Sequence, residues 1–145
     1  MFGTPKALPM VPIAMAIFSA GCLLNLDTGP GFGILQSVVA MGEALPESSR
    51  AAGGTAAATV SGQIVGKLPC DEVNGEVEED GDELRVIITL RADRQVCSGL
   101  APTTFSYIAN LLNVEAGDRT IIVEHRYVGV DGVDGVRLDT IIVVG

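Results

Sequence analysis

This chain of 145 residues contains no tryptophan, only two tyrosines and four phenylalanines, and a single histidine. So few aromatic side chains leave little on which nucleobases or sugar rings could stack. Basic residues are also scarce, with 9 lysines and arginines against 18 acidic residues, so the net charge is −9. A chain this acidic repels phosphate backbones, which excludes nucleic acid as a partner. It gains nothing from anionic lipid headgroups either, so any attachment to a membrane has to be hydrophobic.

Motifs of known catalytic and metal sites are equally missing. The chain has no G-x-S-x-G elbow, no Walker loop and no C-x-x-C pair. Its one histidine, His125, lies on the apolar side of an alternating stretch, where a packed residue is more usual than a catalyst. Zinc needs three or four nitrogen or sulfur ligands, which this chain cannot supply. We therefore predict that the protein is not an enzyme and has no catalytic residue, no metal and no cofactor.

Two acidic stretches are the remaining candidates for a cation, because calcium prefers carboxylate ligands. The run from Glu76 to Glu83 lacks the D-x-D-x-D-G ligand spacing, so we interpret it as a solvated turn. Asp131 and Asp134 lie in the glycine-rich loop from Val130 to Gly135 and are the minor alternative.

The N-terminal region has the composition of an export signal. Lys6 and the α-amine give a short positive start, an apolar stretch is densest over residues 13–18, and small residues follow it. This order is typical of a secretory signal peptide. A transmembrane helix is the alternative, because the apolar run 7–24 approaches the roughly twenty residues that span a bilayer. Pro9 and Pro12 interrupt the first half of that run.

The end of this region, Phe18-Ser19-Ala20-Gly21-Cys22, resembles the lipobox of bacterial lipoproteins. The resemblance implies that Cys22 receives a diacylglyceryl group, that the signal is cut before it, and that the new amine is acylated by a fatty acid such as palmitate. Two or more acyl chains hold a protein stably on a bilayer. The expectation is thus an exported protein of the cell envelope, anchored by lipid at the outer membrane or facing the periplasm. A plain secretory cut after Gly21 is the alternative.

We expect three parts: a signal peptide over residues 1–21, a lipidated N-terminus and flexible tether over 22–58, and a folded domain over 59–145. The tether is predicted because residues 46–58 include no large apolar side chain and are typical of a flexible linker. Apolar residues between 32 and 45 roughly fit one face of a short helix. The domain 59–145 is expected to fold by itself.

Residues 59–145 alternate between apolar and polar side chains, as half-buried strands do. Six short strands with glycine-rich turns are predicted, which favours an all-β fold, an antiparallel β-sandwich of about six to seven strands. The order of strands and turns resembles an immunoglobulin-like or fibronectin-type domain. The predicted inward-facing sets are Val60, Gly62 and Ile64; Val73, Gly75 and Val77; Leu84, Val86, Ile88 and Leu90; Phe105, Tyr107, Ala109 and Leu111; and Ile121, Val123, His125 and Tyr127, followed by a final strand from Leu138 to Val144.

Of the three cysteines, one lies at the end of the predicted signal peptide and two lie in the predicted folded domain. If Cys22 carries lipid, Cys70 and Cys97 remain, and an even pair in an exported domain indicates a disulfide. An Asp-Gly turn predicts a hairpin between them. With Val77 opposite Leu84, that hairpin brings the two cysteines near the same end. Two free thiols are the alternative.

Together these features predict a lipid-anchored cell-envelope protein that is a non-catalytic binding or structural module. Its membrane contact would be the lipid, and a protein partner is expected at the end loops or at an edge strand. Residues 141–144 are apolar on both faces, which favours either an edge open to a partner or a strand buried between neighbours. The alternative function is an enzyme, or an accessory subunit of one, that acts on cell-wall or outer-membrane material.

Overall fold

The computed structural model describes residues 30–92, 97 and 101–145. The predicted signal peptide and Cys22 lie outside the described residues. Within the described part no helix has the length and apolar character to cross a membrane. The regular elements are β1 (Gly31–Met41), β2 (Ser48–Gly54), β3 (Ala57–Gly66), β4 (Glu72–Asp80), β5 (Glu83–Arg91), β6 (Thr103–Leu112), β7 (Gly117–Val128) and β8 (Gly135–Val144).

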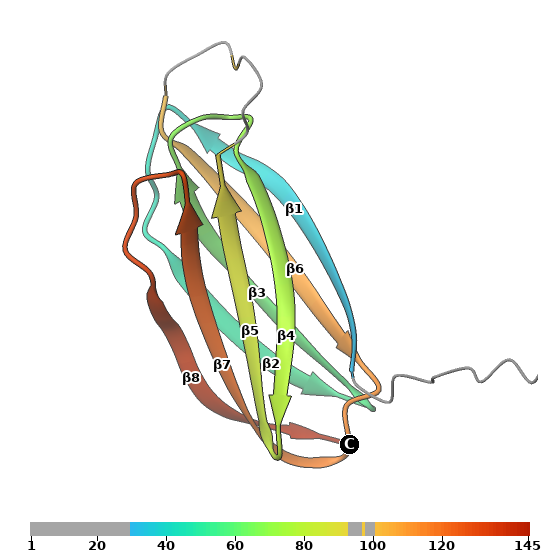
Figure 1. Ribbon diagram of the computed structural model, residues 1–145. Helices are drawn as coiled ribbons and strands as arrows, with labels where there is room; N and C mark the ends of the chain where they lie inside the picture. The colour runs from blue at the N-terminus through green and yellow to red at the C-terminus, as the bar shows by residue number, and fades with distance from the viewer. Residues whose placement is uncertain (1–29, 93–96, 98–100) are drawn as a thin grey trace, which may run out of the picture.

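The strands form two four-stranded sheets that pack face to face (Figure 1). The first, sheet A, has the order β1-β6-β3-β2, and the second, sheet B, has the order β4-β5-β7-β8. The prediction of an all-β sandwich is therefore confirmed, with eight strands in place of six or seven. The expectation of purely antiparallel sheets is wrong at one pair, because β5 and β7 run parallel. They do so because β6, which separates them in the chain, crosses to the other sheet.

The core lies between the sheets and is built from alternate residues, as the pattern predicted. The four inward-facing residues of β5, which are Leu84, Val86, Ile88 and Leu90, are all completely buried. The predicted inward sets of β3, β6 and β7 are buried as well, apart from Gly62 and Tyr127, which are half-buried. Burial of a whole side chain of this kind contributes about 1.5–3 kcal/mol, so these sets hold the two sheets together.

Charged side chains cover the outer face of sheet B. Ile87 and Ile122 point outward by their alternation, yet Ile87 is completely buried and Ile122 is 9% exposed. Arg85 and Arg126 both bind the carboxylate of Glu124, at 3.2 and 2.7 Å, and their stems lie along this face. Long charged side chains often cover apolar groups in this way. Over β5 and β7, the outer face of sheet B is therefore covered by ion pairs.

The prediction of a flexible tether over 22–58 is wrong for most of the residues that the structure describes. Residues 31–41 and 48–54 are β1 and β2, the two edge strands of sheet A. The short helix expected between residues 32 and 45 is also wrong, because its apolar residues divide between the two faces of a strand: Phe32 and Ile34 pack on the core. Sheet A is thus completed by residues that precede position 59.

The composition of β2 is explained by its neighbour β8. An added Cβ at Gly53 would overlap the carbonyl oxygen of Val143, so a side chain there would push the two edge strands apart. At the end of the same seam, the backbone N–H of Gly145 donates to the oxygen of Gly54 at 3.0 Å, and Ala56 donates to Gly145 at 2.8 Å. The small residues that suggested a linker are those that let two sheet edges meet.

The final strand, β8, is an edge strand and is not buried on both sides. Ile141 and Val143 are 68% and 69% exposed, whereas Ile142 and Val144 are 7% and 2% exposed. One face of the strand therefore packs on the core and the other is open to solvent.

The hairpin of β4 and β5 has a slightly different register from the expected one. Val77 lies opposite Val86, where the sequence suggested Leu84. A shift of two residues leaves every side chain on its predicted face, because the period of a strand is two. Cys70 and Cys97 lie beyond the open end of this hairpin and form a disulfide, with their Cα atoms 5.9 Å apart. The predicted pairing is thus present in the structure.

We expect loss of this disulfide to lower the free energy of unfolding by about 3 kcal/mol while the sandwich still forms. The bond closes a loop of 27 residues, and opening it restores conformational entropy to the unfolded chain. Urea unfolding of the wild-type chain and of a Cys70→Ser/Cys97→Ser variant measures the difference. Cys22→Ser is the control, and it should leave the midpoint unchanged. Equal midpoints for the wild type and the double variant would contradict the expectation.

Candidate functional site

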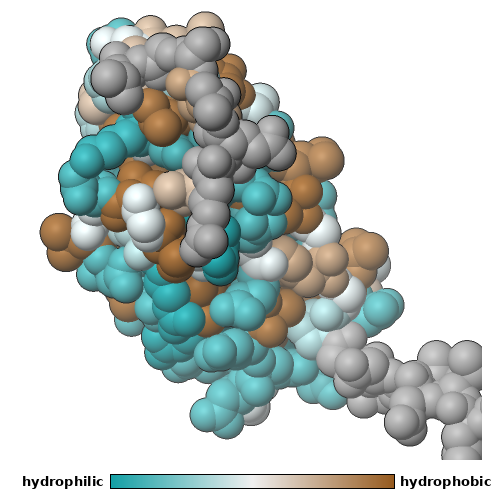
Figure 2. Space-filling model, turned by 45° about the horizontal axis from the view of Figure 1, so that its top comes forward, coloured by the Kyte–Doolittle hydropathy of each residue, from teal (hydrophilic) through white to brown (hydrophobic). Residues whose placement is uncertain are grey.

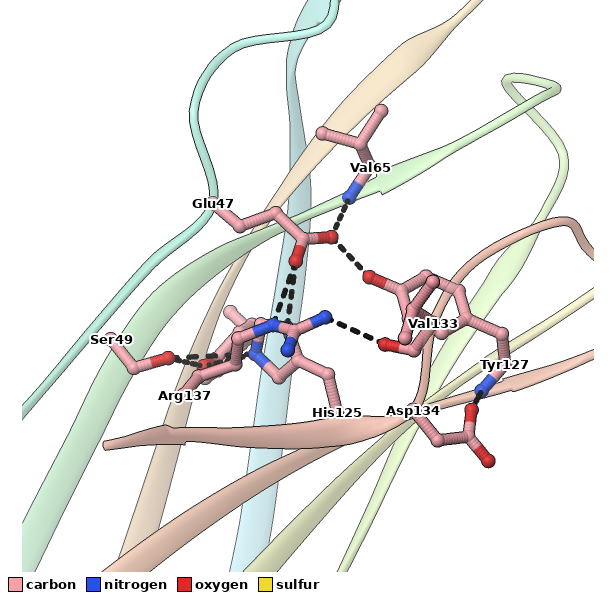
Figure 3. A network of polar contacts seen from close by, with 9 residues as sticks. Glu47, Ser49, Val65, His125, Tyr127, Val133, Asp134 and Arg137 are labelled. Atoms are coloured by element: carbon pink, nitrogen blue, oxygen red, sulfur yellow. Dashed lines mark hydrogen bonds and ion pairs between the residues drawn. The ribbon is translucent and has the colours of Figure 1, made fainter. Parts of the chain in front are cut away.

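A network of polar side chains lies between the sheets near the β2 and β8 edges (Figure 3). Its centre is Glu47, in the loop that leads from β1 into β2, and His125 in β7. The other side chains come from four strands: Ser49 in β2, Tyr107 in β6, Tyr127 in β7 and Arg137 in β8. Segments distant in the chain are thereby joined through one group of hydrogen bonds.

The loop before β2 is held in place by Thr104 at the start of β6. The buried Thr104 hydroxyl accepts a hydrogen bond from the backbone N–H of Leu45 and donates one to the oxygen of Glu43, each at 3.0 Å. A single hydroxyl thus satisfies two backbone groups of the loop. The loop backbone is fixed two residues before Glu47, which aims that side chain into the sandwich.

The Glu47 carboxylate binds partners on both oxygens. Oε1 accepts hydrogen bonds from the Tyr127 hydroxyl and, at 3.3 Å, from the backbone N–H of Val65. Oε2 accepts from Nε of Arg137 at 2.9 Å and lies 3.5 Å from Nδ1 of His125. Charge-assisted bonds of this kind are the stronger class of protein hydrogen bond. Glu47 therefore ties β2 to three other strands.

These contacts decide the protonation of the site. Burial by itself would raise the pKa of Glu47, but hydrogen bonds from His125, Tyr127, Val65 and Arg137 outweigh it and lower the pKa to about 2. Burial raises the pKa of Tyr107 to about 12. Burial, together with the neighbouring Glu47, also raises the pKa of Tyr127. At neutral pH Glu47 is thus a carboxylate and both tyrosines are hydrogen-bond donors.

On its other side His125 contacts Tyr107 and Ser49. The Tyr107 hydroxyl lies 2.9 Å from Nε2 of His125, and the Ser49 hydroxyl lies 2.7 Å from the Tyr107 hydroxyl. The two rings meet edge to face, with centroids 5.6 Å apart. In the arrangement of protons that gives each hydroxyl an acceptor, Ser49 donates to Tyr107 and Tyr107 donates to Nε2 of His125. The ring proton then lies on Nδ1, which is buried without a hydrogen-bond partner although Oε2 of Glu47 lies 3.5 Å away.

Gly62 makes room for this chain of hydroxyls. It lies between Tyr107 and Ser49 in the cross-strand row of sheet A, paired with both. An added Cβ at Gly62 would overlap the Tyr107 hydroxyl. The missing side chain therefore lets the tyrosine reach across β3 to the edge strand, as glycines in strands often do for a neighbouring aromatic ring.

In space, the hydroxyl of Ser49, the imidazole of His125 and the carboxylate of Glu47 lie in a row, as the nucleophile, base and acid of a hydrolytic triad do. The distances between them, however, favour a structural role. Ser49 Oγ is 3.4 Å from Nε2 of His125, and Glu47 Oε2 is 3.5 Å from Nδ1. Both distances exceed the roughly 2.6–3.2 Å that links a nucleophile to its base. The nearer partner of Ser49 is Tyr107, and His125 has 0% exposure. The interpretation of His125 as a packed residue agrees with this burial.

Most of this network was missed in the sequence. The alternating pattern predicts an inward face only for His125, Tyr107 and Tyr127, and it predicts no partner for any of them. One signal was present, because a histidine on a buried face needs hydrogen-bonding neighbours. It could not identify Glu47 or Arg137, which lie far from His125 in the chain and meet it only through the sheet topology.

Several of the acidic residues considered for calcium have partners within the protein. In the described part, no three or more histidine, cysteine, aspartate or glutamate side chains are grouped so that they could hold a metal ion. The pairings are Asp131 with Lys67, Asp134 with the backbone N–H of Tyr127, Asp82 with Arg119, and Glu83 with Arg85. These carboxylates fasten turns and loops to the sheets.

Two of the hollows in the described part do not reach the charged centre of the network. One of about 350 Å³ is almost wholly apolar and is lined by Lys67, Leu68, Ala101 and Pro102, in the segments that flank the disulfide. A more polar one of about 240 Å³ lies over the middle of sheet A, with Tyr107 and Gly62 in its lining. Neither hollow is lined by His125 or Glu47, so a molecule bound in either hollow would not contact these two residues.

No known protein family, no curated protein and no solved structure matches this chain.

Proposed function

We propose that this chain is a lipid-anchored cell-envelope protein whose β-sandwich is a non-catalytic binding or structural module. The lipid would be carried by Cys22, in the segment that resembles a lipobox. The Cys70–Cys97 disulfide is consistent with an extracytoplasmic location, because such bonds persist in oxidising compartments. The sandwich would present its end loops or a strand edge to a partner, in the manner of an immunoglobulin-like domain.

The observation that supports a non-catalytic role is the burial of His125. The histidine is completely enclosed, and the hydroxyl and carboxylate groups around it bind one another. Hydrogen bonds join most members of this network, although Nδ1 of His125 has no hydrogen-bond partner, and such bonds rigidify a core and favour one packing of the strands. A rigid domain of this kind suits presentation of a surface.

Substitution of Cys22 by alanine tests the anchor. The wild-type chain should be found in the membrane fraction, and its mature mass should exceed that of the peptide beginning at Cys22 by the mass of several acyl chains. Cys22→Ala should lose the added mass and leave the membrane fraction, because the apolar chains that hold a lipoprotein on a bilayer would be absent. The Cys70→Ser/Cys97→Ser variant is the control and should stay membrane-bound. A wild-type chain that is unmodified and soluble would overturn the anchor.

The alternative is a hydrolase that acts on envelope material, and the order Ser49–His125–Glu47 is the observation in its favour. A fluorophosphonate probe, which reacts with activated serine hydroxyls, separates the two functions. Under our proposal wild type and Ser49→Ala react equally little. Labelling of the wild type that disappears in Ser49→Ala would favour the enzyme.

A further inference from the structure

Sheet A is almost free of charge, although the chain as a whole is strongly acidic. Its four strands contain no acidic residue, and Arg50 in β2 is their one charged residue. Each strand of sheet B contains at least one acidic residue, and β4 contains five. Figure 2 shows that hydrophilic residues dominate the face of sheet B. The negative charge of the strands therefore lies in sheet B, and the strands of sheet A carry a single positive charge.

Polar side chains lie in register on the outer face of sheet A. Two neighbouring rows cross β2, β3 and β6: Arg50, Ser61 and Ile108 in the first, and Ser48, Gln63 and Ser106 in the second. These six residues line the hollow of about 240 Å³, together with Gly62 and Tyr107, which lie between the rows. Pockets for drug-sized ligands measure roughly 300–1,000 Å³, so this hollow suits a ligand of about one small ring.

The guanidinium of Arg50 is held beside the hollow but is not neutralised. Its Nε donates a hydrogen bond to the Ser61 hydroxyl at 3.2 Å. Within the described residues Arg50 pairs with no carboxylate, whereas one lysine and four other arginines each do. The terminal nitrogens of Arg50 can therefore bind a carboxylate by two parallel hydrogen bonds, which is the preferred geometry of this pair.

The rest of the lining can both donate and accept hydrogen bonds. The hydroxyls of Ser48 and Ser106 and the amide of Gln63 supply both kinds of group. Ile108 is 45% exposed and adds an apolar contact at one side. Tyr107 is only 1% exposed, so a ring in the hollow would be recognised by hydrogen bonds and not by stacking on an aromatic face.

We propose that this hollow binds a sugar acid, a hexuronate, whose carboxylate pairs with Arg50 and whose ring hydroxyls meet the serine and glutamine side chains. A carboxylate carries one negative charge, which one arginine balances. A phosphate group carries about −1.5 to −2 at pH 7 and would leave an unbalanced charge beside an acidic chain. The hexuronate is either a free monosaccharide or one unit of an acidic polysaccharide. This inference does not rest on the proposed function, since it uses neither the lipid nor a protein partner.

The test is a ligand-observed NMR titration of the full chain, as processed by the cell, in a detergent without a sugar headgroup. The probes are D-glucuronate and D-galacturonate, and we expect at least one of them to bind. Glucose and galactose lack the carboxylate and acetate lacks the ring hydroxyls, so each should bind at least about tenfold more weakly. Failure of both hexuronates to bind would overturn the proposal, as would equally tight binding of acetate or of the neutral sugars.

Two variants place the ligand in this hollow. Arg50→Gln should raise the dissociation constant at least about tenfold, because the charge-assisted pair is lost. Gln63→Met removes the amide with little change in size and should raise it about threefold or more. A thermal melt checks that both variants fold.

Arg91→Gln is the matched control. Arg91 is also exposed, forms no ion pair within the described residues and lines a polar hollow of about 180 Å³, but on sheet B beside Glu76. This variant should leave binding unchanged. Equal weakening by Arg91→Gln and Arg50→Gln would mean that only the overall charge matters, and it would overturn the proposal.

A trimer of the hexuronate that binds distinguishes the two sources. Tighter binding of the trimer than of the monomer would assign the site to an acidic polysaccharide, and weaker binding would assign it to a free sugar acid. In both cases Arg50→Gln should weaken the ligand that binds more tightly.

Discussion

A chain that starts at Ala57, without β1 and β2, will not unfold cooperatively, and its circular dichroism will lack the signal of a packed β-sandwich. The truncation leaves sheet A with only β3 and β6, and a two-stranded sheet is marginal in water. It also removes Phe32 and Ile34 from the core, and Glu47 from the polar network. Losses of this kind are comparable with the roughly 5–15 kcal/mol that stabilise an ordinary domain.

The matched control begins at Pro30 and keeps all eight strands. It should show one sharp thermal transition under the same conditions. A truncated chain that melts as cooperatively as this control would show that β1 and β2 are accessories, and that residues 59–145 are the folding unit after all.

The sequence predicted the strands that bury alternate side chains and missed those that do not. β3 to β8 were found, because their inward residues recur with a period of two. In β1 the exposed Leu35 and Val39 add outward apolar residues, so the alternation is hidden and a helical face fits roughly as well. β2 contains only serine, arginine, alanine and glycine, a composition shared with flexible linkers.

The same limit explains the missing parts of the site. The alternation of apolar and polar residues predicts which side of the sheet His125 and Tyr107 face, because the facing of a side chain depends on its position along its own strand. It gave no information on Glu47, which precedes a strand that was not recognised. The partners of Arg137 depend on which edges meet, and that is a property of sheet order, not of local pattern.

Glu47→Gln is expected to lower the free energy of unfolding by about 2 kcal/mol at pH 7, and by much less near pH 2. The pKa of Glu47 is lowered from 4.5 to about 2. Each pKa unit corresponds to about 1.4 kcal/mol, so the shift is worth about 3 kcal/mol, and about 2 after screening at a partly exposed group. A depressed pKa stabilises the fold above the unfolded value of 4.5 and loses that contribution as the pH falls toward 2.

Urea unfolding at a series of pH values from 7 to 2 measures this difference between the wild type and the variant. Glu43→Gln is the matched control, because Glu43 lies in the same loop but is exposed and uses only its backbone oxygen in the contact with Thr104. It should change stability by less than about 0.5 kcal/mol throughout. A constant gap between Glu47→Gln and the wild type over the whole pH range would mean that the carboxylate charge does not stabilise the network.

The pairing of β1 with β6 also dictates an order of assembly. Gly31 pairs with Leu112, so the first strand of the sandwich has no partner until most of the domain has been synthesised. The β4–β5 hairpin joins strands adjacent in the chain and can form early, whereas contacts between distant segments slow β-sandwiches to folding times of roughly milliseconds to seconds. Throughout that interval β1 is bare on both edges. Until β6 pairs with it, β1 is therefore an uncharged apolar strand open to pairing with other chains, and slow pairing of β6 would lengthen the time during which the folding chain is prone to aggregate.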